Sequence, residues 1–204
     1  MLCETVRLVS PSQERSSHNP FRLTGDFLNM RLEGFLDQKK TLVLKKWFEQ
    51  VAQTYPADTS KFLNSQKDPF ANPVGGTFKR GLEALFDELL QGWNAEAVRT
   101  CLDPMIRIRA IQDFTPARAV SFIFSLKHIL RNALKKELKG DRLVDELFLF
   151  ETRIDETAML AFNIYMECRE KIYELKATEI HNRTFRAFER AGLVSAISEE
   201  GPGR

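Results

Sequence analysis

Few residues in this chain have the types and spacing needed for catalysis or metal binding. No HExxH or CxxC spacing occurs, and Gly75–Gly76 lacks the lysine and the spacing of a phosphate-binding loop. The sequence therefore predicts a non-enzymatic protein that binds no metal and no cofactor. The alternative that the protein is an enzyme would need a polar cleft, which the sequence would place between residues 68–76 and residues 107–113. The residues that could have carried such chemistry are His18, His128, His181, Cys3, Cys101 and Cys168.

His128 is the residue on which a haem alternative depends. On the helix expected after Thr115, it falls nearly opposite the apolar face and one turn after Phe124. A haem ligand would need the buried side of that helix. The alternative of a globin-like binder of haem or of a small hydrophobic ligand stays open, and a Soret band that depends on His128 would favour it.

Charged residues give a second set of candidates. Asp155 and Arg169 project into the apolar sector of the final predicted helix, where a charge needs a partner. Our hypothesis is that Asp155 pairs with Arg107 or Arg109 and locks this helix to the rest of the domain, in a cluster that includes Asp113. The alternative is that these are ordinary charges at a helix surface.

The segment expected to position these residues is 141–191, which contains no proline and no glycine. As one helix it would be about 75 Å long at about 1.5 Å per residue. Its wide apolar sector before Met166 predicts burial in a helical bundle, and the narrower stripe afterwards predicts a projecting, coiled-coil-like arm. After Leu175 the apolar positions turn by about 120° around the helix. The heptad pattern predicts a dimer contact made by Leu147, Ile154, Ala158, Ala161, Tyr165, Cys168, Ile172 and Leu175.

Shorter helices are expected before it, so the predicted class is all-α. The apolar spacing predicts helices over 36–55, after residue 58, over 77–91, over 94–102, over 104–111 and from 116 to about 139. A long loop containing Asp68, Pro69, Asn72, Pro73 and Gly75 separates the second from the third. We expect a disordered leader over 1–31, a helical domain over 32–193 and a flexible tail over 194–204, with Met30 as an alternative start.

Composition limits the partners. The formal net charge is +2, from 30 basic and 28 acidic residues, which gives no electrostatic signal for nucleic acid or for an anionic membrane. No apolar run is long enough for a signal peptide or a membrane span. An odd number of cysteines fits a reducing compartment, so we expect a cytoplasmic protein.

Four separated segments resemble a known family. They are TYP at 54–56, KDPFANPVG at 67–75, RIRAIQDF at 107–114 and CREKIYEL at 168–175. Together they are similar to the N-terminal domain of RsbR-type stressosome co-antagonists, the RsbRD type, over about residues 32–193. The resemblance implies a globin-like helical bundle that usually binds no haem, forms dimers and passes a signal through its last helix to a C-terminal STAS domain.

The sequence departs from that plan after its last predicted helix. It stops at Arg204, so the STAS domain with its phosphorylatable threonines is not in it. We therefore expect a homodimeric sensory or regulatory module whose arm contacts another protein.

Overall fold

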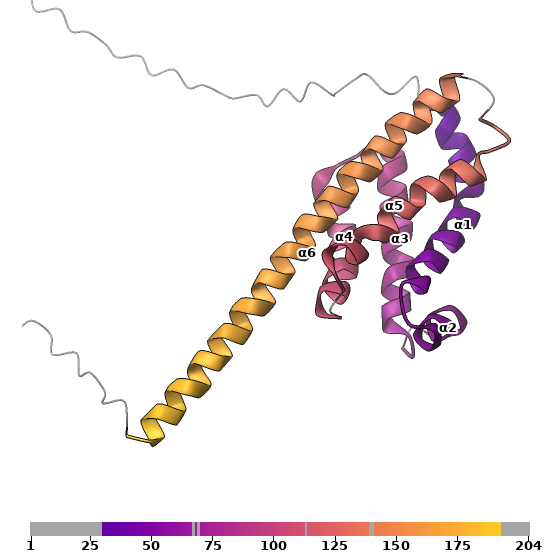
Figure 1. Ribbon diagram of the computed structural model, residues 1–204. Coiled ribbons are helices and arrows are strands. Elements are labelled where there is room, and N and C mark those ends of the chain that lie inside the picture. Colours follow the sequence, from indigo (N-terminus) through magenta and orange to yellow (C-terminus); the bar gives the residue numbers. More distant parts are fainter. Residues whose placement is uncertain (1–29, 67, 69, 113, 139–140, 193–204) are drawn as a thin grey trace, which may run out of the picture.

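The computed structural model describes residues 30–66, 68, 70–112, 114–138 and 141–192. Within these ranges the chain forms helices and no strands, which confirms the predicted all-α class (Figure 1). Of the predicted leader, residues 1–29 lie outside the described residues, whereas residues 30 and 31 belong to the first helix, so the predicted leader extended two residues too far. The predicted tail also lies outside the described residues. The helices are α1 (Met30–Gln53), α2 (Ala57–Ser65), α3 (Pro73–Gln91), α4 (Ala95–Ile111), α5 (Pro116–Ala133) and α6 (Asp141–Arg190).

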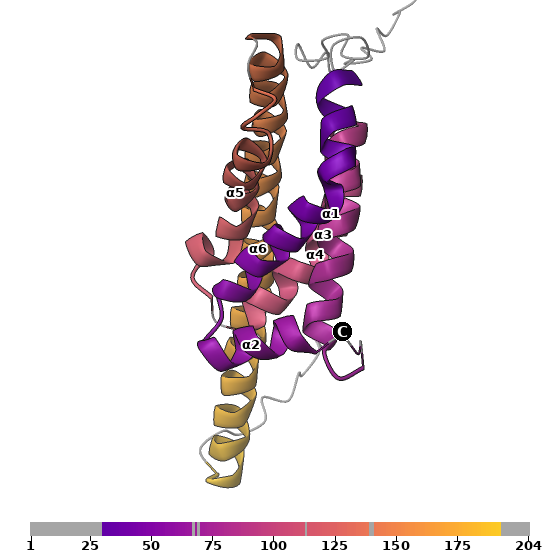
Figure 2. The same ribbon diagram turned by 90° about the vertical axis from the view of Figure 1, so that its right-hand side faces the viewer.

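The helices pack around one apolar core. α6 packs mainly against α4 and α5, whereas α1 packs against α5 and α3, and the short α2 lies at one end beside α1 (Figures 1 and 2). Trp47 is fully buried and donates a hydrogen bond from Nε1 to the carbonyl oxygen of Phe122 at 2.7 Å. The Phe122 ring in turn meets the Phe78 ring edge-on, with 6.0 Å between centroids. These contacts join α1, α3 and α5 at the centre of the bundle.

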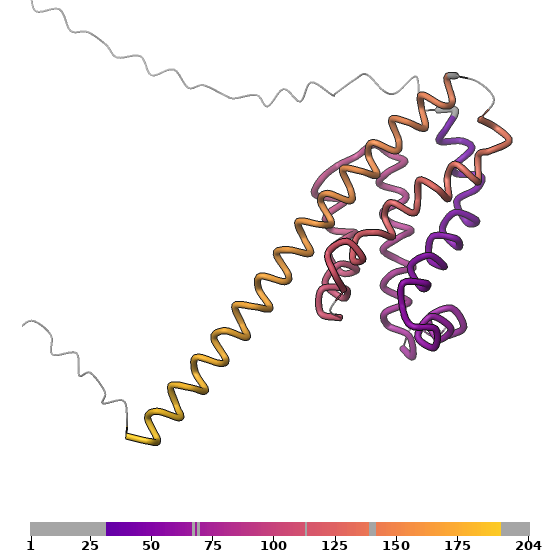
Figure 3. Tube along the Cα trace, in the orientation of Figure 1, coloured from indigo at the N-terminus to yellow at the C-terminus, as the bar shows by residue number. Residues whose placement is uncertain are grey.

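α6 has 50 residues and is the longest element, as predicted. At about 1.5 Å per residue it extends about 75 Å, which is longer than the bundle can cover. Its first half lies along α4 and α5, and its second half extends beyond the other described helices (Figures 1 and 3). From Glu170 to Arg190 every side chain except Ile172 is exposed. We call residues 170–190 the arm.

The first helix begins earlier than the sequence suggested. The prediction began it at Leu36, but α1 starts at Met30, and Leu32 is fully buried. The backbone N–H of Leu32 donates to Oε2 of the buried Glu146 on α6 at 3.1 Å. A carboxylate at a helix N-terminus accepts a hydrogen bond from a free N–H and interacts favourably with the helix dipole. Glu146 of α6 therefore stabilises the start of α1.

Other predicted boundaries were wrong. α5 ends at Ala133 and does not continue to about residue 139. α3 begins at Pro73, with Asn72 as its N-cap, rather than at Thr77. α4 is one helix, although the sequence predicted a break at Pro104. An interior proline costs about 3 kcal/mol. Leu102, Met105 and Ile106 are fully buried around it, and the burial of three such side chains outweighs that cost.

Candidate functional site

The connection between α4 and α5 joins three parts of the bundle. We call residues 109–118 the α4–α5 corner. Arg109 donates from Nη2 to Oγ1 of Thr54 at 3.0 Å, and Arg118 donates to the carbonyl oxygen of Thr54 at 2.8 Å. The hydroxyl of Tyr55 donates to Oε1 of Gln112 at 2.9 Å. The corner is therefore held to the C-terminal end of α1.

Arg109 is fully buried among aromatic rings. Its guanidinium carbon lies 4.8 Å from the ring centroids of Phe114 and Phe122, 5.2 Å from that of Phe78 and 5.7 Å from that of Tyr55. Nη1 donates to the carbonyl oxygen of Arg118 at 2.9 Å, whereas Nε has no hydrogen-bond partner among the described residues. Burial lowers the pKa of Arg109 to about 10. The charge is thus held by ring faces, by the carbonyl oxygen of Arg118 and by the hydroxyl oxygen of Thr54, all of which attract a cation in a dry site.

The same corner contacts α6 at the end of the bundle. The hydroxyl of the buried Tyr165 donates to the carbonyl oxygen of Phe114, and Nη1 of Arg169 donates to that of Ala110 at 3.0 Å. Nη2 of Arg169 also donates to the hydroxyl of Tyr173 at 2.7 Å. The corner is therefore attached to α6 at the point where the arm begins.

The predicted pairing of Asp155 was wrong. Asp155 accepts a hydrogen bond from Lys127 of α5 at 2.7 Å, and Arg107 pairs with Asp103 one turn earlier on its own helix at 2.6 Å. Arg109 points into the bundle while the exposed Arg107 points out of it. Helical periodicity locates the face on which a charge lies but not which neighbouring helix supplies its partner. Of the predicted polar cluster, Arg109 lies in the corner, Arg169 contacts the corner, and Asp113 lies outside the described residues.

The predicted loop motif is a capping structure. Asn72 is buried, accepts from the backbone N–H of Gly75 at 2.8 Å, and donates from Nδ2 to the carbonyl oxygens of Leu63 and Gln66, both at 3.2 Å. One side chain thus satisfies both the start of α3 and the end of α2. Pro73 occupies the first position of α3, Asp68 accepts from the N–H of Phe70, and Pro69 lies outside the described residues.

A small pocket lies between this capping structure and the corner. Its volume is about 140 Å³. It occurs where the sequence placed the cleft of the enzyme alternative, but its lining contains no acidic, basic or cysteine side chain. The side chains therefore offer no acid, base or nucleophile pair of the usual kind. The lining consists of Tyr55, Thr59, Phe62, Leu63, Asn72, Pro73, Val74 and Gln112.

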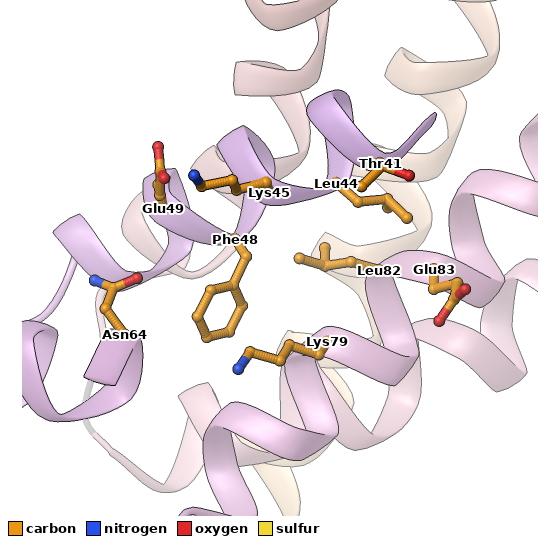
Figure 4. Close-up of a pocket in the computed structure, with 9 residues that line it drawn as sticks. All are labelled: Thr41, Leu44, Lys45, Phe48, Glu49, Asn64, Lys79, Leu82 and Glu83. Carbon is orange, nitrogen blue, oxygen red and sulfur yellow. The ribbon is translucent and has the colours of Figure 1, made fainter. Parts of the chain in front are cut away.

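A larger open groove of about 730 Å³ runs between α1 and α3 (Figure 4). Its apolar floor is already covered, because Phe48 and Leu82 are buried and Nζ of Lys79 lies 4.9 Å from the Phe48 ring centroid. Lys45 and Glu49 line one side, and Lys79 and Glu83 line the other (Figure 4). Both signs of charge alternate there, so the groove has no charge preference for an anionic or a cationic ligand.

His128 lies on the outside of α5. It is exposed, and its Nε2 lies 2.8 Å from Nδ2 of Asn132. The apolar environment that a haem ligand requires is on the opposite face of that helix, where Phe122, Leu126 and Ile129 are buried. No group of three potential metal-ligating side chains occurs among the residues that the structure describes.

Along the bundle, the residues predicted to form the dimer contact lie on the face of α6 that packs against the other helices of the same chain. The first five of them are buried in their own subunit by 95% or more, so a second chain cannot reach them, and Cys168 and Ile172 are partly buried. Leu175 is exposed, because it lies on the arm. The five core members are Leu147, Ile154, Ala158, Ala161 and Tyr165.

A second apolar stripe on α6 faces solvent, and the periodicity of the sequence predicted only its last part. At about 100° per residue its members fall within a sector about 80° wide, roughly 125° from the buried face. Met159, Met166, Tyr173 and Ile180 recur at every seventh position. We call this set the outward stripe: Val144, Phe148, Met159, Phe162, Met166, Tyr173, Ile180 and Phe188, each between 36% and 68% exposed.

Comparison with known families identifies the domain. The family model for the RsbT co-antagonist protein rsbRD N-terminal domain matches residues 42–180. This chain belongs to the RsbRD N-terminal domain family. No curated protein and no solved structure matches it.

The match to the RsbRD N-terminal domain family gives the corner a context. All four segments that carry the resemblance lie within the matched range, and they meet in space around the corner and its pocket. The family implies a stressosome-related signalling role. Among the described residues, no helix combines the length and the apolar character that a membrane span requires.

Proposed function

We propose that this RsbRD-type domain is a non-enzymatic, cytoplasmic signal-input module that dimerises along α6 and passes a signal through the arm to a partner protein. The observation that carries the proposal is the outward stripe. It is apolar and exposed, and from Met159 it continues into the arm. Between Phe148 and Met159 it is interrupted by Asp155, which pairs with Lys127. An exposed apolar surface of this extent is typical of an interaction site.

A second copy of the same chain fits this stripe best. From Val144 to Ile180 the stripe extends about 54 Å at about 1.5 Å per residue, and only another long, straight helix can follow it over that length. The repeat of Met159, Met166, Tyr173 and Ile180 at every seventh residue is the spacing of a left-handed coiled coil. α6 is the one described element that is both long enough and apolar on a free face.

Transmission would use the contacts of the α4–α5 corner. Phe114 and Ala110 hold α6 through Tyr165 and Arg169, and the arm begins directly after Arg169. A change in the position of the corner would therefore alter how α6 leaves the bundle. In a dimer, such a change would shift the packing of the two arms against each other.

Sedimentation equilibrium tests the proposal. We expect the full chain to be a dimer and Phe162→Glu to be a monomer at the same concentration, because a buried unpaired carboxylate in the dimer contact is costly. Leu149→Glu is the matched control. Leu149 is 47% exposed on the same helix but lies off the outward stripe, so this variant should remain a dimer.

Two results would overturn the proposal. One is a monomeric wild-type chain at concentrations of about 0.1 mM, where even a modest dimer affinity gives mostly dimer. The other is equal loss of dimer in Phe162→Glu and Leu149→Glu, which would place the contact elsewhere on the bundle.

A further inference from the structure

The small pocket beside the corner is placed to connect a ligand with α6. Three of the four segments that carry the family resemblance contribute to its lining, through Tyr55, through Asn72, Pro73 and Val74, and through Gln112. The fourth segment contains Arg169, whose acceptor Ala110 is only two residues before Gln112. One short stretch of backbone thus touches both the pocket and the start of the arm.

The chemistry of the lining defines what the pocket can hold. Phe62, Leu63, Pro73 and Val74 supply apolar walls. An enclosed apolar cavity of about 150 Å³ holds benzene. This pocket has a similar volume of about 140 Å³ but is open to solvent on one side, where Phe62 and Gln112 are exposed. With no acidic or basic side chain in the lining, a charged ligand would lose its hydration without gaining a counter-ion.

Hydrogen-bonding capacity remains at one side of the pocket. Asn72 already uses both amide hydrogens and its oxygen in capping. Tyr55 donates to Oε1 of Gln112, which leaves the lone pairs of the phenol oxygen and the Gln112 amide hydrogens available. Burial raises the pKa of Tyr55 above its ordinary value, so the phenol is neutral at physiological pH.

We infer that this pocket binds a small neutral molecule with an apolar body and one hydrogen-bonding group, and that its occupancy repositions the α4–α5 corner against α6. The inference rests on the proposed function, since it supplies the input for the proposed signal. A ligand that contacts Tyr55 and Gln112 acts directly on the corner. The Tyr55 ring also meets the Phe114 ring edge-on at 5.2 Å, and Phe114 accepts the hydrogen bond of Tyr165.

Phenol is the test ligand, with benzoate as the charged analogue. Amide NMR spectra of the isotope-labelled full chain should show saturable shifts at the lining residues on addition of phenol and no saturable shifts with benzoate. If occupancy is coupled to α6, shifts should also occur at Tyr165, Arg169 and Tyr173. If the amide shifts do not extend beyond Gln112, occupancy of the pocket is not coupled to α6. If the shifts never saturate, phenol has no specific site in this pocket.

Two variants and a control locate the binding. Val74→Phe fills the pocket and should abolish saturable phenol binding, with circular dichroism to check that the chain is folded. Gln112→Leu, at an exposed position, should weaken phenol binding about tenfold by removing the hydrogen-bond partner. Phe70→Ala should leave binding unchanged, because Phe70 is 97% exposed and does not line the pocket. Unchanged binding in the folded variants Val74→Phe or Gln112→Leu would overturn the inference.

Sedimentation of the same samples separates the two proposals. A monomeric chain that binds phenol with shifts reaching Tyr165 removes the dimer proposal and supports the ligand site. A dimer that binds no phenol supports the dimer proposal and removes the ligand site.

Discussion

Tyr165 on α6 donates its hydroxyl hydrogen to the backbone carbonyl oxygen of Phe114, which lies in the α4–α5 corner. Both residues are buried, with exposures of 2% and 9%. A buried acceptor that loses its donor cannot turn to water, so this bond is expensive to remove. The contact fixes α6 to the corner just before the arm begins.

Tyr165→Phe should therefore destabilise the domain by about 1–3 kcal/mol, because the Phe114 carbonyl oxygen is left without its donor. Urea denaturation measures the free energy of unfolding. Tyr173→Phe is the control. Tyr173 is 56% exposed on the arm, so loss of its hydroxyl group should change the free energy of unfolding by less than about 0.5 kcal/mol. Equal effects of the two substitutions would contradict this account of the corner.

Arg109 and Arg107 offer a matched pair of arginines on one helix. Arg109→Ala should cost about 3 kcal/mol or more, since it leaves a cavity among four aromatic rings and removes the donors to Thr54 and Arg118. Arg107→Ala should cost at most about 0.5 kcal/mol, because it removes one surface ion pair with Asp103. Thermal unfolding of both variants checks the difference. A similar small effect for both would show that the buried guanidinium is not important for the fold.

Two adjacent glycines at the start of α3 should respond in opposite ways to alanine. A Cβ on Gly75 would lie 2.3 Å from Nδ2 of Asn72, whereas one on Gly76 would lie 3.4 Å from the nearest atom of Arg80. Gly75→Ala should therefore displace the capping side chain and destabilise by about 1–3 kcal/mol. Gly76→Ala should be neutral or stabilising by up to about 1 kcal/mol, as expected for a helical position. Chemical denaturation of both variants would show the contrast, and equal stabilities would mean that Asn72 does not fix this turn.

The ion pair between Lys39 and Glu137 should make stability depend on acid pH. Lys39 donates to Glu137 at 2.8 Å, and this hydrogen bond holds the pKa of the Glu137 carboxyl below its ordinary value. The unfolded chain then binds more protons than the folded chain at mildly acidic pH. The stabilisation is present above the ordinary glutamate pKa of about 4.3 and is lost as the pH falls through the lower folded value.

Melting temperatures of the wild type and of Glu137→Gln, recorded from about pH 7 to about pH 3, test this sign. The wild type should melt higher at neutral pH, and the difference should vanish in acid. Glu170→Gln, on the exposed arm, is the control and should follow the wild type throughout. A difference that persists unchanged to low pH would mean that the pair does not supply it.

Removal of residues 1–29 should leave the melting temperature unchanged if Met30 can serve as the start. The reason is that the described core begins with Leu32 and Leu36, both fully buried. A version that starts at Asp37 is the control, and it should melt far lower because it loses both side chains and the N–H that Glu146 holds. A sharp fall in the first truncation would refute the prediction of a dispensable leader.

The sequence alone determined the helical class and the extent of α6. Residues 141–190 contain no helix breaker, and their apolar residues recur at helical spacing, so local propensity and periodicity agree. Thr115 and Asn94 cap α5 and α4 as their positions predicted, because capping depends on neighbouring backbone groups. The family model also confirmed the family resemblance, because that resemblance depends on short linear segments and not on contacts between distant residues.

Only the tertiary structure decided which face of α6 is free. The helix carries two apolar stripes, and periodicity gives their spacing without showing which one the other helices cover. α4 and α5 cover the stripe of Leu147 and Ile154, so the part of the predicted dimer contact that runs along the bundle is not accessible to a second chain. The partner of Asp155 and the capping role of Asn72 were likewise hidden, since both depend on groups brought close by packing. Contacts between distant segments are set by the fold as a whole, and a linear pattern does not contain them.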